Sequence, residues 1–316
     1  MKIRPGSSRW MSTTADACHF VACTGAIEIT DSHFQGMGDD AVNIHGYFHQ
    51  VLSTSSTPIG VRFATKDNQW HVAYRRLDTV GFYDGATLSL IGTATVLQAP
   101  TPVAATPDQY DLLLSAVPPL PANAILSNET LVPTALIQGC LVEDHRGRAF
   151  VLQTRGVDVL DNHITGSTGP AISVRCDAAD WWESTGGQLV FLERNVIDRS
   201  NFGAASSHAA IQVHAESISG TTPAPGAHRD LRIAENWITN TPRSGIFVGH
   251  SVRASIVGNQ LSNVCTAPQT LEQSYAVVLV QDDLIAVTGN VRSPAGNGCH
   301  FPSSTNVTLN INLGFL

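Results

Sequence analysis

The segment Leu231-Arg232-Ile233-Ala234-Glu235-Asn236-Trp237-Ile238 decides the fold, because versions of it recur along the chain. In each version, apolar residues alternate with polar ones before an Asn, which is typical of a β-strand with one buried face. The other copies lie at 157–164, 189–197, 254–261 and 285–291, and an early copy at 27–34 has Ser in the Asn position. This self-similarity predicts an all-β solenoid, a right-handed parallel β-helix.

The repeated Asn indicates how one corner of each coil is built. An Asn after a short strand can take the left-handed conformation and hydrogen-bond to nearby backbone. In stacked coils such side chains can also pair into a ladder inside the bend. The Asn spacings of 33, 41, 23 and 31 residues indicate one bare coil and several coils with added loops.

A second type of strand interleaves with the first. Its copies lie at 17–20, 41–45, 149–153, 171–175, 210–214 and 245–249. Apolar positions alternate with varied polar ones, so one side faces the core and the other is the side that solenoids use for binding. Cys18 falls on the inward side and is expected to be a buried thiol. Arg175 and His214 fall on the outward side, and we interpret them as surface residues.

The stretch from about 48 to 133 interrupts the repeat. It contains Pro, Ser and Thr clusters, but also alternating apolar pieces that argue against an unstructured loop. We interpret it as an inserted small β-barrel or sandwich. The predicted organisation is therefore β-helix coils at 1–47, the inserted domain at 48–133 and further coils at 134–316.

The composition narrows the classes of partner. The chain has a net charge of −8 and no run of basic residues, so we expect no nucleic-acid partner. No apolar run is long enough to span a membrane, and the first residues lack the apolar core of a signal peptide. None of the six cysteines forms a CxxC pair, so a structural zinc site is not expected.

The strongest sign of chemistry is Gly38-Asp39-Asp40-Ala41-Val42-Asn43-Ile44-His45-Gly46. When the second strand is aligned, Asp16 lies one coil away from Asp40, and adjacent parallel strands are about 4.8 Å apart. Asp16, Asp39 and Asp40 should therefore gather at one edge of one face. Clustered carboxylates raise one another's pKa, which favours acid/base work, with a calcium site as the competing use.

Hydrolysis of a glycosidic bond suits such a cluster. It needs one protonated and one ionised carboxyl group, and inverting enzymes space the two about 6.5–9.5 Å apart, a range that neighbouring coils can reach. His19, Asn43 and His45 lie beside the aspartates on the outward side, and we expect them to contact the substrate.

The aspartate segment resembles the motif of glycoside hydrolase family 110, the α-1,3-galactosidases. So does Thr14-Ala15-Asp16-Ala17-Cys18-His19-Phe20, as do the segments 147–156 and 176–184. The order of coils and insertion also agrees, and the resemblance covers about residues 10–265. It implies exo-cleavage of a terminal α-linked galactose with inversion, without a metal or cofactor.

Carried over from this family, the catalytic acids and bases would be Asp16, Asp39 and Asp40. The resemblance leaves open which is which; our weak preference is for Asp16 to donate the proton and for the Asp39–Asp40 pair to activate water. The implied substrate is an oligosaccharide or glycoconjugate with a terminal α-galactose. The family also suggests a secreted or periplasmic location.

Three further residues are candidates for substrate binding. Arg148 takes the position of Asp40 in the next coil, where it could hold a hydroxyl group, set the aspartate pKa values or form a plain salt bridge. Trp182 and Glu183 share a loop, and an aromatic ring next to a carboxylate suits sugar binding. The alternative for Trp182 is a ring folded over the core of its own loop.

Family members carry additional coils before the region that this chain matches. The first coil is therefore expected to expose an end that solenoids usually cap, and a homo-oligomer partner is one way to cover it. Two other functions stay open from the residues alone: a non-catalytic carbohydrate-binding solenoid, and another β-helix enzyme that degrades polysaccharides, such as a lyase.

Overall fold

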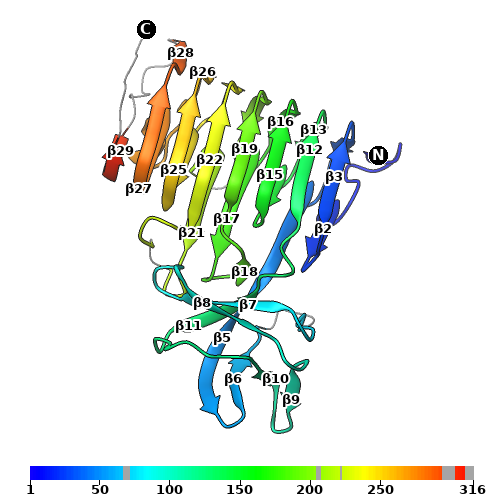
Figure 1. Ribbon diagram of the computed structural model, residues 1–316. Helices are drawn as coiled ribbons and strands as arrows, with labels where there is room; N and C mark the ends of the chain where they lie inside the picture. The colour runs from blue at the N-terminus through cyan, green and yellow to red at the C-terminus, as the bar shows by residue number, and fades with distance from the viewer. Residues whose placement is uncertain (67–71, 204–207, 221–222, 294–302, 310–316) are drawn as a thin grey trace.

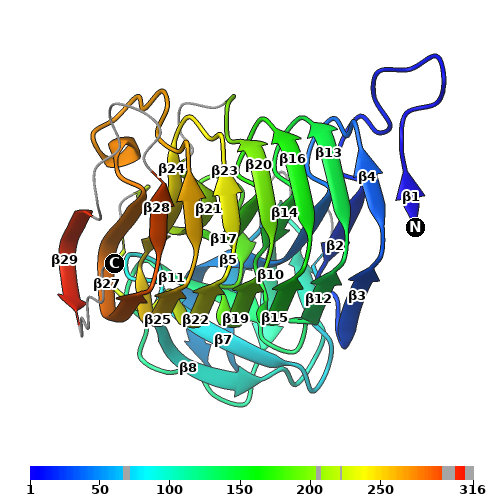
Figure 2. The same cartoon turned by 90° about the horizontal axis from the view of Figure 1, so that it is seen from above.

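The computed structural model describes residues 1–66, 72–203, 208–220, 223–293 and 303–309. It is a right-handed parallel β-helix with a β-barrel inserted in the second coil, after β5, so the predicted fold class is confirmed (Figures 1 and 2). Each coil contributes one strand to each of three parallel sheets. No helix within these ranges is long and apolar enough to cross a membrane.

The three sheets run along the helix axis in coil order. The first contains β2 (Cys18–Val21), β5 (Val42–Ser56), β14 (Phe150–Leu152), β17 (Ile172–Asp177), β21 (Ala209–Glu216), β24 (Ser244–Gly249) and β27 (Val277–Thr288). The second contains β3 (Ala26–Thr30), β12 (Thr134–Gln138), β15 (Arg155–Leu160), β19 (Gln188–Glu193), β22 (His228–Ala234), β25 (Ser251–Val257) and the later part of β27. The third contains β1 (Lys2–Ile3), β4 (His33–Gln35), β13 (Leu141–His145), β16 (His163–Ser167), β20 (Val196–Ser200), β23 (Trp237–Thr239), β26 (Gln260–Ser262) and β28 (Val291–Ser293). β29 (Ser303–Leu309) pairs with β27.

The inside of the tube is apolar because alternate residues of every strand point inward. Ile44, Phe150 and Ile172 are fully buried in successive coils. Cys18 belongs to the first coil, where only one neighbouring strand pairs with β2. Its thiol is free and only partly buried, so the prediction of a buried thiol was too strong.

A ladder of asparagines runs along the corner between the second and third sheets. Asn195, Asn236 and Asn259 are fully buried, and each Nδ2 donates to the Oδ1 of the Asn in the next coil at 2.8–3.0 Å. Each Oδ1 also accepts from the backbone N–H of the Asn in the preceding coil, as in the 3.0 Å bond from Asn195 to Asn236. The predicted ladder is confirmed, and it satisfies polar groups that would otherwise be buried without partners.

The left-handed residue at this corner is the one before the Asn, not the Asn itself. Glu235 has φ 57° and Gly258 has φ +66° immediately before Asn236 and Asn259. The expectation that the Asn takes the left-handed conformation was therefore wrong. The preceding residue makes the bend, which leaves the Asn side chain free to point along the helix axis.

The insertion is an antiparallel barrel that grows out of β5. Its other strands are β6 (Ile59–Ala64), β7 (Thr79–Asp84), β8 (Leu90–Thr95), β9 (Thr101–Val103), β10 (Thr106–Leu113) and β11 (Ala124–Asn128). A bridge between Val96 and Leu114 closes it around a core that includes Phe63 and Phe82. β5 continues unbroken from the solenoid into the barrel (Figure 1). The domain limits at 47 and 133 stay a prediction.

The ladder predicts a large effect for Asn236→Ala. The substitution removes a buried amide that bonds Asn195, Asn259 and the carbonyl of Leu192. Because each stranded partner is penalised by about 1–3 kcal/mol, we expect the free energy of unfolding to fall by roughly 2–4 kcal/mol. Equilibrium denaturation measures this change in the free energy of unfolding. Gln260→Ala, at an exposed position of the next coil, is the control, and equal losses would rule out a special role for the ladder.

Candidate active site

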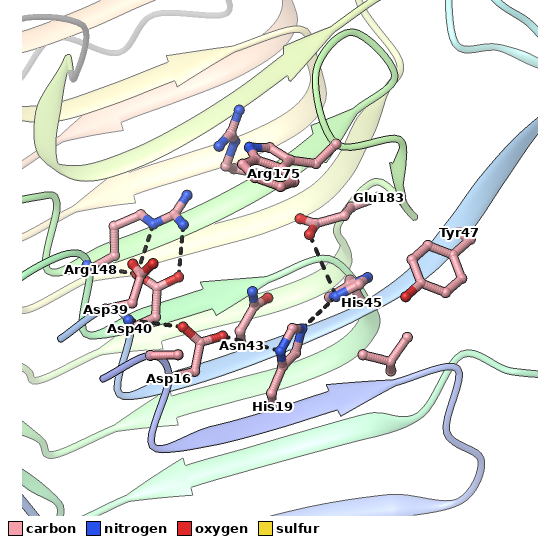
Figure 3. Close-up of a pocket in the computed structure, with 13 residues that line it drawn as sticks. Asp16, His19, Asp39, Asp40, Asn43, His45, Tyr47, Arg148, Arg175 and Glu183 are labelled. Carbon is pink, nitrogen blue, oxygen red and sulfur yellow. Dashed lines mark hydrogen bonds and ion pairs between the residues drawn. The ribbon is translucent and has the colours of Figure 1, made fainter. Parts of the chain in front are cut away.

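A pocket of about 530 Å³ lies on the outward side of the first sheet, within the size range of small-molecule sites. Its side chains come from the first four coils and from the loop between β17 and β19 (Figure 3). Eight of the nine predicted site residues line it: Asp16, His19, Asp39, Asp40, Asn43, His45, Arg148 and Glu183. The register of the first sheet therefore gathers residues that lie up to 132 positions apart (16 to 148), and the loop adds Glu183.

Asp40 and Arg148 form the central ion pair of the pocket. Asp40 is 1% exposed, and its two carboxylate oxygens accept from Nε and Nη2 of Arg148 at 2.9 and 2.7 Å. The backbone N–H of Arg148 donates to the same carboxylate at 2.8 Å. A bidentate pair of this kind fixes the orientation of the carboxylate.

The other two aspartates lie against this pair. The backbone N–H of Asp40 donates to Asp16 Oδ1 at 3.2 Å, as the predicted stacking requires. One carboxylate oxygen from each of Asp16, Asp39 and Asp40 lies within 4.8 Å of the others. Burial, followed by the charge of Asp40, raises the pKa of both Asp16 and Asp39. The site can therefore hold a proton on a carboxyl group next to a fixed carboxylate.

Gly147 makes this crowding possible. It has φ +94°, and a Cβ at this position would lie 2.8 Å from Asp39 Oδ1 and 3.0 Å from Asp40 Oδ1. Any larger residue would displace the aspartates or strain the turn that leads into Arg148.

A chain of hydrogen bonds leads away from Asp16. His19 Nδ1 lies 3.4 Å from Asp16 Oδ2, and His19 Nε2 lies 2.7 Å from His45 Nε2. Nδ1 of His45 is 2.8 Å from the carbonyl of Gly46 and must donate to it. Burial lowers the pKa of His45, so this ring is neutral and its Nε2 accepts the proton of His19. With these tautomers, Nε2 of His19 carries the proton and Nδ1 of His19 faces Oδ2 of Asp16.

Glu183 lies across the pocket from the aspartates (Figure 3). It belongs to β18 (Glu183–Ser184), which pairs antiparallel with β5 and brings Glu183 opposite Tyr47. One carboxylate oxygen is 3.5 Å from His45 Nε2, and the other accepts from Gln153 Nε2 at 2.5 Å. Burial, together with the charge of Glu183, raises the pKa of Tyr47, a pocket residue that the sequence patterns did not point to.

Trp182 is not in the pocket, and its prediction as a substrate ligand was wrong. Its ring is 4% exposed in a cluster with Phe48 and Tyr83, between the loop, the barrel and the solenoid. The preceding residue, Trp181, is 56% exposed and lines the pocket. Trp182 has φ 58°, and this turn of the backbone separates the directions of the two rings.

Arg175 and His214 are largely buried, so their interpretation as surface residues was wrong. Their side chains are 17% and 16% exposed. Arg175 pairs with Asp177 and Glu216 at 3.1 and 3.2 Å, and His214 Nε2 lies 3.2 Å from Glu216. The neighbouring loops and coils cover these outward positions, which the alternation of one strand could not reveal.

Comparison with known proteins supports the family resemblance. No family model matches the chain. The chain is 28% identical over 240 residues to "Alpha-1,3-galactosidase B" of Bacteroides thetaiotaomicron, covering 72% of this chain and 37% of that protein. It is 25% identical over 285 residues to "Alpha-1,3-galactosidase A" of Shewanella woodyi, covering 88% and 45%. The chain thus spans less than half the length of these curated relatives.

Among solved structures, the chain is similar to the Gp54 tailspike of Acinetobacter baumannii bacteriophage AP22, at 11% identity and a TM-score of 0.23. That match covers 94% of this chain and 62% of the tailspike.

The aspartate cluster predicts that Asp39→Asn stabilises the folded protein at neutral pH. Because the folded-state pKa of Asp39 is raised, its ionised form destabilises the native state above that pKa. Asp39 is exposed, so we expect a gain of at most about 1 kcal/mol. The gain should shrink as the pH falls through the raised folded-state pKa and should be gone below the unfolded-state pKa of about 3.8, where the carboxyl group is neutral in both states.

Urea denaturation at several pH values checks this prediction. Asp108→Asn, on the exposed side of the barrel, is the matched control. A lower stability of Asp39→Asn at pH 7 would contradict the claim that the ionised Asp39 side chain destabilises the folded protein.

Proposed function

We propose that this chain carries the catalytic site of an inverting exo-α-galactosidase that removes terminal α-1,3-linked galactose. The observation that carries the proposal is the cluster of Asp16, Asp39 and Asp40 in one pocket, with the bidentate Arg148 fixing one member as a carboxylate. Such a cluster supplies both a protonated and an ionised carboxyl group, the two groups that glycoside hydrolysis needs. The named relatives point to galactose as the sugar.

Asp39 is the better candidate for the proton donor, in place of Asp16, which the sequence weakly favoured. It is the most exposed member of the cluster, and its pKa is raised by partial desolvation and by the charges of Asp40 and Asp16. A general acid works best with a pKa near the working pH and within reach of the leaving oxygen.

Asp16 is the better candidate for the base that activates water. The oxygens of Asp40 are taken up by Arg148, whereas Oδ2 of Asp16 faces the ring of His19. The hydrogen-bonded pair of His19 and His45 can receive the proton that Asp16 takes from water. Asp40 and Arg148 would then hold the two reacting carboxyl groups in place.

The remaining pocket residues suit a hexose ring. Trp181 offers an exposed aromatic face, and Tyr47, Asn43 and Glu183 offer hydrogen-bonding groups. An apolar surface with a few placed polar groups is the usual composition of a small-molecule site.

Inversion is proposed on the family resemblance. The nearest carboxylate oxygens lie within 4.8 Å, which is shorter than the about 6.5–9.5 Å between carboxyl groups of inverting enzymes. The anomer released first is therefore the decisive measurement. A β-galactose product from a terminal α-1,3-galactoside, followed by NMR, supports inversion, and an α-product means retention.

A calcium site is a weaker reading of the same carboxylates. Arg148 already neutralises Asp40 and occupies both of its oxygens, so a cation would have to displace a buried ion pair. A second candidate function, a carbohydrate-binding solenoid without catalysis, is favoured by the spacing of the carboxylates, which is shorter than that of inverting enzymes. It predicts saturable sugar binding with no release of galactose.

Substitution of the aspartates tests the roles. We expect Asp16→Asn, Asp39→Asn and Asp40→Asn each to lower kcat/KM for a terminal α-1,3-galactoside by about 10²–10⁴-fold. Asp108→Asn should leave it unchanged. Full activity in all three pocket variants would mean that another site does the chemistry.

The leaving group separates the donor from the base. If Asp39 donates the proton, Asp39→Asn should lose far less activity on an aryl galactoside with an acidic phenol than on the natural glycoside, because such a phenol leaves without protonation. Asp16→Asn should lose activity on both substrates equally. The opposite pattern would return the donor role to Asp16.

A further inference from the structure

A second pocket of about 420 Å³ adjoins the first on the same sheet. The two share Asp39, Arg148 and Arg175 among their lining residues. The second pocket extends to the turn between β16 and β17, which includes Thr168, and to β21, which supplies His214.

Arg175, which lines both pockets, pairs in register with His214 of the second pocket. The strands that carry His45 and Arg175, β5 and β17, both pair with β14, so His45 lies two coils before Arg175. This row of lining residues runs from the proposed catalytic site into the second pocket. Parallel strands are about 4.8 Å apart, so the row extends over roughly 14 Å, which is enough for more than one sugar ring.

The charges in the second pocket are largely paired with one another. Arg175 bonds Asp177 and Glu216, and Glu216 also bonds His214. The pairing holds the pKa of Glu216 down, at about 2, with the His214 hydrogen bond as the main cause. These paired side chains offer hydrogen-bond donors and acceptors but little net charge. Such a lining suits the hydroxyl groups of a neutral sugar better than it suits an anion.

We propose that the second pocket binds the neutral sugar residues that follow the terminal galactose in the glycan. This rests on the proposed function, since it places the bond to be cleaved beside Asp39, where the two pockets meet. The galactose would occupy the first pocket and the leaving glycan the second.

Kinetics on two substrates test the subsite. We expect kcat/KM to be about tenfold higher for an α-1,3-galactosyl trisaccharide than for the corresponding disaccharide, mainly through a lower KM. Asp180→Ala, at the exposed edge of the second pocket, and His214→Leu should each remove that advantage. Neither should change kcat/KM for α-galactosyl fluoride, whose leaving fluoride is too small to occupy the second pocket.

Asp108→Ala on the barrel is the matched control for Asp180→Ala, and thermal melting establishes that each variant is folded. Equal kcat/KM values for the two oligosaccharides in the wild type, or an advantage that survives in both folded variants, would overturn the subsite.

Calorimetric titration with lactose separates this proposal from the proposed function. Lactose is a neutral disaccharide without α-galactose, so it reports on the second pocket even if the chain cleaves nothing. Saturable binding that both variants weaken at least fivefold supports the subsite. The absence of binding to the wild type overturns it, whatever the result of the hydrolysis assay.

Discussion

The parallel register between coils is the constraint on which the rest of this structure depends, and the asparagine ladder enforces it. Asn236 bonds both neighbouring asparagines through one amide, so a coil that slipped by one residue would strand several buried polar groups. A slip would also turn the apolar side of each strand outward. The ladder and the core thus select the same register, and this agreement fixes which outward side chains become neighbours.

That register turns ordinary residues into a reactive cluster. Asp16 and Asp40 belong to different coils, yet a backbone N–H of one bonds the carboxylate of the other. Arg148, one coil further along, supplies the charge that makes the crowding tolerable. Breaking a buried ion pair leaves an uncompensated charge, so Asp40 and Arg148 depend on each other. Raised pKa values at Asp16 and Asp39 follow from the same packing, so the ionised forms of these two residues lower the stability of the folded protein.

Much of this could be read from the sequence because it is periodic. Alternation predicts the inward and outward positions, and the alignment of the strands predicts that Asp16 lies next to Asp40. The expectations that were wrong depend on loops and on neighbouring coils, which leave no periodic signal in the sequence. Trp181 and Trp182 are adjacent in a loop, and only the backbone turn at Trp182 decides which ring enters the pocket. Arg175 has the pattern of a surface residue, and its burial comes from other coils and loops.

The barrel contributes to the pocket through the strand that it shares with the solenoid. β5 carries His45 and Tyr47 at the site and then continues into the barrel, while β18 pairs with it and brings Glu183 opposite Tyr47. The buried ring of Trp182 packs this junction against Phe48. Glu183 therefore sits on a short strand held on two sides, although it comes from a loop. A site whose side chains are held by strands keeps its geometry before a ligand binds, and the proposed proton transfer between carboxyl groups would require such preorganisation.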